Sequence, residues 1–185
     1  MDRVFLGIEW LPSQVQAVNP VLILMFIPLF SQVVYPVLGK WFRVTPLRKI
    51  AIGLFLASFS FAISIGIEAR IEAGGQPNII WQLAAYAVLT AAEVMVSITC
   101  LEFSYTQAPA RMKSLIMSLY MMSVAAGNLF TSLVNRFIQN EDGTSKWTGT
   151  TYYAFFALLM LTAAIAFLAV VRFYREKTYI QGTEE

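Results

Sequence analysis

Glu93 is the residue of this chain whose type and position most clearly indicate chemistry. It lies in an apolar run in which no other charged residue occurs between Ile79 and Leu101. A run of about 20 such residues can cross a bilayer as a helix. At a rise of about 1.5 Å per residue, Glu93 lies roughly 18 Å along that helix from Trp81, near the bilayer centre. A carboxylate there costs on the order of 2.5–3.5 kcal/mol and usually marks a substrate or ion path, although a paired Glu can also simply hold helices together.

The composition is that of a membrane protein. Hydrophobic residues make up 58% of the 185 residues and charged residues 13%, whereas soluble domains carry about 25% charged residues. The chain has no His, which excludes a His-based metal site or catalytic triad, and the single Cys100 cannot form an internal disulfide. The sequence also has no Gly-x-Ser-x-Gly elbow, phosphate loop or metal-ligand cluster. We therefore expect no enzyme activity, no catalytic residues, no metal or organic cofactor and no nucleic-acid partner.

Hydropathy predicts an all-α transmembrane chain. We expect five spans, at roughly 16–41, 46–69, 78–107, 112–138 and 152–173. Thr45 and Pro46 have the residue types of an N-cap and a first helical position. The third span should end at Ala108, because a residue that precedes proline avoids the helical conformation.

The distribution of basic residues predicts the orientation. One set of connections carries nine basic residues: Lys40, Arg43, Arg48, Lys49, Arg111, Lys113, Arg172, Arg175 and Lys177. The opposite set carries four: Arg3, Arg70, Arg136 and Lys146. By the positive-inside rule the first set is cytoplasmic, so the C-terminus lies inside and the N-terminus outside. Five spans with an outer N-terminus and no secretory signal lead us to expect the trailing part of a longer chain.

Polar and small side chains recur at helical spacing in two spans. The third span carries Tyr86, Thr90, Glu93, Ser97, Cys100 and Ser104. The fourth carries Ser114, Ser118, Met121, Ala125, Asn128, Ser132 and Asn135. Steps of three and four residues place each set on one helix face, which we expect to point towards other helices or a cavity. Small polar residues can also serve as packing contacts between membrane helices, which is the simpler interpretation for each serine taken alone.

The first span is interrupted by Pro20, Pro28 and Pro36. Proline removes a backbone donor and kinks a helix, and transporters use such helices in gating and binding. Asn19 offers a donor and an acceptor beside the first kink, although it could simply cap the helix. Glu102 lies about 13 Å beyond Glu93 on the same helix, near the predicted cytoplasmic interface, where a structural or gating role is expected.

The segment Glu93–Ser114 resembles the tenth helix and following loop of proton-dependent oligopeptide transporters. Its pattern is E-x-x-x-S-x-x-x-L-E-F-S-Y-T-Q-A-P-x-x-M-K-S. The stretch 14–20, with Pro28 and the pair Tyr35-Pro36, is similar to the family's eighth helix, and 127–129 is similar to the middle of its eleventh. The resemblance covers essentially the whole chain. It implies a major facilitator fold of which this chain supplies helices eight to twelve, most of the C-terminal bundle, with the first seven helices missing.

The resemblance also implies roles for single residues. Glu93 matches the glutamate that receives the peptide's amino terminus and takes part in proton coupling. Asn19 matches an asparagine that contacts the peptide backbone, and Ser97 lies beside the same site. Tyr120 stands where many bacterial members carry a tryptophan that lines a side-chain pocket, so pocket size is open. Glu102 is a weaker candidate for proton coupling or gating.

The expected function is therefore part of a proton-coupled di- and tripeptide symporter in the inner membrane of the cell, working by alternating access with protons as the coupling ion. Its expected partners are small peptides, the lipid bilayer and the missing N-terminal helices. Two alternatives remain: a related carrier of nitrate or another small organic anion, and a small complete membrane protein that scaffolds a complex. An anion carrier should prefer positive charge in its cavity, whereas the charge seen here is Glu93.

Overall fold

A computed structural model describes residues 4–5, 8–9, 12–41, 43–140, 142 and 144–174. Its helices are long and apolar enough to cross a membrane five times, at Gln16–Trp41, Pro46–Glu72, Ile79–Gln107, Lys113–Ile138 and Gly149–Phe173. The predicted all-helical transmembrane fold with five spans is confirmed. Two short antiparallel strands, β1 (Val4–Phe5) and β2 (Ile8–Glu9), precede the first helix. Arg3, Arg175 and Lys177, which contribute to the predicted charge asymmetry, lie outside the described residues.

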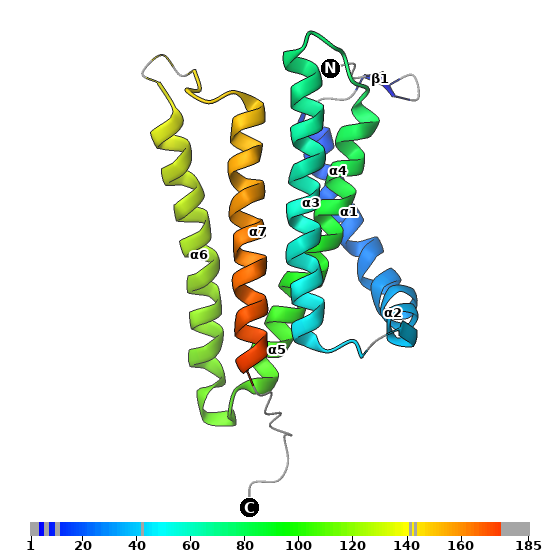
Figure 1. The fold of residues 1–185 in the computed structure, drawn as a ribbon. Coiled ribbons are helices and arrows are strands. Elements are labelled where there is room, and N and C mark those ends of the chain that lie inside the picture. Colours follow the sequence, from blue (N-terminus) through cyan, green and yellow to red (C-terminus); the bar gives the residue numbers. More distant parts are fainter. Residues whose placement is uncertain are drawn as a thin grey trace, which may run out of the picture.

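The first span is divided by its prolines. Helix α1 (Pro12–Leu29) continues through a π-helical segment, η1 (Phe30–Val34), into α2 (Tyr35–Trp41). Pro28 and Pro36 lie on either side of η1, and each lacks the N–H that a regular helix would use. The Ser31 hydroxyl donates to the carbonyl of Pro28 over 3.1 Å. The chain therefore bends between α1 and α2, and α2 points away from the rest of the bundle (Figure 1).

Local sequence signals fix the ends of the next helices. Helix α3 (Pro46–Glu72) begins after Thr45, whose hydroxyl accepts the Arg48 backbone N–H over 3.4 Å, as the sequence predicts. It ends in a turn at Gly74, which has a φ of 81°; this left-handed conformation suits glycine.

The third span consists of α4 (Ile79–Glu93), a second π-helical segment η2 (Val94–Ile98) and α5 (Thr99–Gln107). It ends at the extended residue Ala108, before Pro109, as expected. Because the π turn shifts the helix by about one residue, the predicted single polar face is wrong beyond η2. On α5 the exposed positions are Leu101, Glu102 and Tyr105, whereas Cys100 and Ser104 are half-buried.

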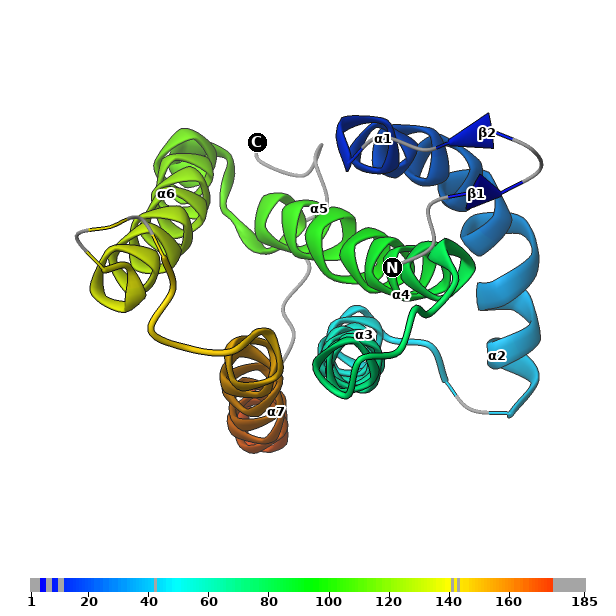
Figure 2. The same cartoon turned by 90° about the horizontal axis from the view of Figure 1, so that it is seen from above.

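Helix α3 lies between α4 and α7 (Gly149–Phe173) and packs against both, as Figure 2 shows from above. The buried Ser60 hydroxyl donates to the carbonyl of Ala85 on α4 over 2.8 Å. The Ser58 hydroxyl donates to the carbonyl of Ala157 on α7 over 3.0 Å. Serine side chains thus join α3 to both neighbours, which is a common way to pack helices in a membrane.

A carboxylate joins the C-terminal end of α3 to the N-terminal end of α7. Glu72, the last residue of α3, accepts the backbone N–H of Thr150 in the first turn of α7 over 3.0 Å. A negative charge at a helix N-terminus satisfies a free N–H and interacts favourably with the helix dipole.

Helix α6 (Lys113–Ile138) stands apart from α7 in both views, although a short loop joins them (Figures 1 and 2). Every residue from 121 to 130 is exposed, including the predicted stripe members Met121, Ala125 and Asn128. The Tyr152 hydroxyl of α7 donates to the Asn135 side-chain oxygen of α6 over 3.0 Å. The polar face of α6 therefore lacks cover from the other described helices along most of its length.

Gly53 of α3 permits a close approach between α3 and the third span. A Cβ added there would lie 2.6 Å from Val96 Cγ2, 3.0 Å from Met95 Cβ and 3.2 Å from the Ala92 carbonyl oxygen. We expect Gly53→Ala to push α3 away from η2 and to destabilise the fold by about 1–3 kcal/mol, as overpacking does.

The measurement is the thermal unfolding of the purified protein in detergent, with Gly66→Ala as the matched control. A Cβ at Gly66, also on α3, would meet nothing within 4 Å. Because alanine favours a helix over glycine, the control should be neutral or slightly stabilising. Equal melting temperatures for both variants would contradict the close contact.

Candidate functional site

The candidate site forms where α1 meets α4. The Asn19 side-chain amide donates to Glu93 Oε2 over 3.3 Å. The other end of the same side chain, the Asn19 Oδ1 atom, accepts a hydrogen bond from the Thr90 hydroxyl. Two predicted site residues that lie far apart in the sequence, Asn19 and Glu93, are thus brought together, with Thr90 as a third member.

Local geometry explains this arrangement. Thr90 and Glu93 are three residues apart on α4, so both lie on the same face of the helix. Asn19 directly precedes Pro20 on α1, where the helix lacks one backbone donor. Thr90 is 0% exposed, Asn19 is half-buried and Glu93 is exposed. The site therefore has a fixed, buried side and an open side that presents the carboxylate.

The hydrogen-bond inventory leaves capacity for a ligand. A carboxylate can accept about four hydrogen bonds, and the one that Glu93 accepts among the described side chains comes from Asn19. The Thr90 hydroxyl carries one proton and lies within reach of two acceptors, Asn19 Oδ1 and the Tyr86 carbonyl at 2.9 Å. Asn19 is therefore held from one side while it positions Glu93 on the other.

Ser97 and Tyr120 form a second pair, one turn further along. The Tyr120 hydroxyl of α6 donates to the backbone carbonyl of Ser97 in η2 over 3.3 Å. The contact joins α6 to the third span at its π turn, and π turns occur often at functional sites. Ser97 itself is exposed, on the same stretch of chain as Glu93. The hydrogen bond from Tyr120 thus goes to the backbone of Ser97 and not to the Glu93 side chain.

Glu102 lies in a different environment. It lines a cavity of about 420 Å³ together with Tyr35 of α2 and Lys49 of α3. Lys113, the first residue of α6, lies 4.3 Å from the ring centroid of Tyr105 on α5, in a cation–π contact. Glu102 is therefore separated from the Asn19–Glu93 pair, and its charged neighbour in the cavity is Lys49.

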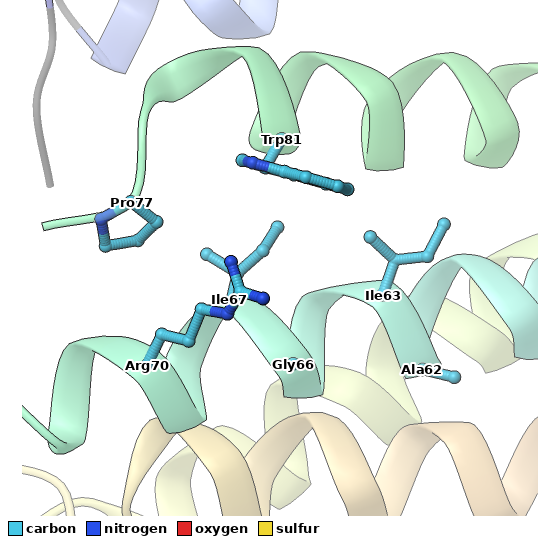
Figure 3. Close-up of a pocket in the computed structure, with 7 residues that line it drawn as sticks. All are labelled: Ala62, Ile63, Gly66, Ile67, Arg70, Pro77 and Trp81. Atoms are coloured by element: carbon cyan, nitrogen blue, oxygen red, sulfur yellow. The ribbon is translucent and has the colours of Figure 1, made fainter. Parts of the chain in front are cut away.

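A smaller pocket of about 230 Å³ lies between the C-terminal end of α3 and the N-terminal end of α4 (Figure 3). Trp81 extends from α4 over Ile63 and Ile67 of α3, and the Arg70 guanidinium lies 5.9 Å from the Trp81 ring centroid. Tryptophan and arginine at a helix end with apolar side chains below them are typical of a membrane interface. Arg70 is the one ionisable residue among the described residues that line this pocket, so they provide no second ionisable group for acid–base chemistry or for binding a zwitterion.

A metal-binding role has no support in the described part of the chain. No group of three or more His, Cys, Asp or Glu residues that could hold a metal ion occurs there. A lone carboxylate held by an amide is instead suited to bind a cationic group or a proton.

Three residues of the Asn19–Glu93 site and the Glu102 cavity were not predicted from the sequence as site residues: Thr90, Tyr35 and Lys49. Thr90 belonged to the predicted polar stripe, and its spacing from Glu93 was a usable signal. No spacing signal in the sequence indicated Tyr35 or Lys49. The bend at η1 and the packing at the start of α3 bring these residues to the Glu102 cavity.

Thr90 should stabilise the fold through its bond to Asn19. We expect Thr90→Val, which keeps the shape but removes the hydroxyl, to lower the free energy of unfolding by about 1–3 kcal/mol, because it leaves Asn19 Oδ1 without its donor. Thr162→Val is a matched control, since the Thr162 hydroxyl also donates to the carbonyl four residues earlier, over 2.8 Å to Leu158, but sits on an exposed face. Thermal unfolding measures both variants, and equal effects would show that the Thr90–Asn19 bond carries no stability.

Comparison with known proteins identifies the family. The model of the POT family matches residues 1–155. The peptide transporter PTR2 of Saccharomyces cerevisiae is 29% identical over 153 residues, which cover 76% of this chain and 26% of the relative. Solute carrier family 15 member 2 of Oryctolagus cuniculus is 34% identical over 140 residues, which cover 71% of this chain and 18% of the relative. The chain thus spans about a quarter or less of the length of these relatives.

Solved structures agree with the sequence relatives. A crystal structure of an auto-inhibited POT family peptide transporter matches with a TM-score of 0.86 and 31% identity, over 98% of this chain and 37% of that one. The in meso crystal structure of the POT family transporter PepTSo matches with a TM-score of 0.79 and 35% identity, over 88% of this chain and 34% of that one. The similar proteins are transporters rather than enzymes. With five membrane spans of major facilitator type and a family match over most of its length, this chain belongs to the POT family of multi-pass membrane transporters.

Proposed function

We propose that this chain is the part of a proton-coupled di- and tripeptide symporter that supplies helices eight to twelve. The observation that carries the proposal is the Glu93 carboxylate, held by Asn19 over 3.3 Å and open on its other side. A carboxylate in this position is a good partner for the ammonium group of a peptide. The peptide transporters similar to this chain support the choice of substrate.

In this proposal, four residues bind the peptide, and each contacts a different part of it. Glu93 binds the amino terminus of the peptide or, in its absence, a proton, which couples the two ligands. Asn19 positions Glu93 and keeps one amide hydrogen and one lone pair free for the peptide backbone. Ser97 and Tyr120 line the same region, where the aromatic ring of Tyr120 faces a peptide side chain. Protons are the coupling ion, and the residues give no reason to add a cofactor.

Transport by alternating access requires a second bundle that rocks against this one around the site. The exposed polar face of α6 supports such a partner, because contact with lipid would be unfavourable for the polar side chains of Asn128 and Ser132. The missing N-terminal helices of the transporter would cover it. A carrier of nitrate or another anion is disfavoured, because the charge near the middle of the third span is negative.

The ammonium-binding role of Glu93 can be tested in the complete transporter. We expect Glu93→Gln to weaken uptake of free dipeptides by more than tenfold, since losing one partner of a desolvated charge pair costs about 2–5 kcal/mol. Dipeptides with an acetylated amino terminus should lose much less, because they never form the contact. Proton-driven uptake and competition with both ligands measure the difference. Asp142→Asn, which removes a carboxylate from an exposed loop, is the control. Unchanged uptake in Glu93→Gln would refute the assignment.

The proposal also places the chain in the inner membrane with its C-terminus in the cytoplasm, following the distribution of basic residues. We expect a single cysteine introduced at Asp142, in the loop between α6 and α7, to react with an impermeant thiol reagent added outside intact cells. A cysteine at the exposed Met112, between α5 and α6, should react after the membrane is opened. The background variant carries Cys100→Ser. The reverse labelling pattern would overturn the proposed orientation.

A further inference from the structure

The cavity that contains Glu102 lies between the first three membrane spans, at the level where η1 joins α2 and η2 joins α5. Its volume is about 420 Å³, within the range of small-molecule sites. Phe30, Val94 and Ile98 provide an apolar wall, and Phe30 and Val94 are buried. Polar groups complete the lining: Ser31, Tyr35, Lys49, Thr99 and Glu102.

The cavity carries one charge of each sign, on different elements. Lys49 comes from the first turn of α3, and its Nζ lies 4.0 Å from the ring centroid of Tyr35, which is a cation–π contact. Glu102 comes from α5 and is exposed. Both side chains are described, and no ion pair within 4.0 Å joins them. The two charged groups therefore lie more than 4.0 Å apart in the cavity lining and do not form an ion pair with each other.

The position of the cavity connects it with the candidate peptide site. Glu102 is nine residues after Glu93, which corresponds to about 13 Å along the helix. The π turn at η2 shifts the exposed face, so that Ile98 and Glu102 continue the exposure that begins at Glu93 and Ser97. A solute that leaves Glu93 towards the predicted cytoplasmic side would therefore meet this cavity next.

This combination matches the chemistry of a zwitterion. A free peptide has an ammonium group at one end, a carboxylate at the other, and side chains that need apolar surface. A carboxylate, an ammonium group and an apolar wall in one cavity provide a partner for each. A purely anionic or cationic solute would leave one of the two charges unmatched, which is unfavourable away from bulk water.

We propose that this cavity is a second, cytoplasm-side site for the zwitterionic peptide, in which Lys49 binds the carboxylate and Glu102 binds the ammonium group. The inference rests on the proposed function and extends it. Tyr35 is a positioning residue, because its ring holds the Lys49 ammonium group. The peptide would occupy this site after it leaves Glu93 and before it enters the cytoplasm.

The test compares the two sides of the membrane, using the complete transporter in right-side-out and inside-out vesicles. Lys49→Gln should raise the KM for a free dipeptide presented from the cytoplasmic side about tenfold and leave the KM from the outer side unchanged. The same variant should not affect a dipeptide with an amidated carboxyl terminus. Glu102→Gln should show the complementary pattern, with its effect lost for an amino-acetylated dipeptide.

Arg48→Gln is the matched control for Lys49→Gln. Arg48 is the preceding residue and has the same charge, but its guanidinium donates to the Arg43 carbonyl over 3.0 Å and does not line the cavity. Lys49→Arg keeps the charge and should retain a low KM from the cytoplasmic side, which separates a charge effect from misfolding.

The outcomes are distinguishable. If the unmodified transporter does not carry peptides from either side, the proposed function fails and this inference falls with it. If it carries peptides but Lys49→Gln and Glu102→Gln leave the cytoplasmic KM unchanged, the second site alone is refuted. Equal effects from both sides, or equal effects on free and blocked peptides, would also refute it, since they indicate gating or folding rather than recognition of the peptide termini.

Discussion

The arrangement of this bundle depends on one constraint: a carboxylate placed within an apolar span must have polar partners. Glu93 meets that requirement through Asn19, and Asn19 is in turn held by the buried Thr90. The small network links α1 to α4 and fixes which faces of the two helices meet. Its buried half stabilises the structure, while its open half presents a charge. The group that is expensive to place in the membrane is therefore also the one that can bind a cationic ligand.

The helices on both sides of this network deviate from regular geometry at the same level. The π turn η2 begins directly after Glu93, and Phe30 of η1 packs against Val94 and Met95 of η2 in one buried cluster. Gly53 lets α3 approach the same turn. Below this cluster, the bent first span and α5 separate enough to leave the cavity that holds Lys49 and Glu102. The buried cluster at the π turns thus also forms part of the wall of this cavity.

Features that depend on local sequence could be predicted, and features that depend on packing could not. Hydropathy, the Thr45 cap and the Ala108-Pro109 end located the spans, because each acts within a few residues. The family resemblance assigned Asn19 and Glu93 separately to peptide binding, and the structure shows a direct contact between them that was not predicted. The shift at η2 was missed because a π turn leaves no reliable mark in a single sequence, so Cys100 and Ser104 were assigned to the wrong face. The cation–π contact of Lys49 with Tyr35 depends on the bend of the first span and on the packing of α3. Neither of these can be predicted from residue spacing.

The central claim is that the Glu93 carboxylate receives the peptide's ammonium group, and infrared difference spectroscopy tests it at the carboxyl group itself. Spectra of the complete transporter, with its glutamates carbon-13 labelled, would be recorded with and without saturating dipeptide. We expect peptide binding to change a labelled glutamate carboxyl band, and Glu93→Gln or an amino-acetylated dipeptide to abolish that change. The same band change in Glu93→Gln, or with the acetylated ligand, would contradict the account.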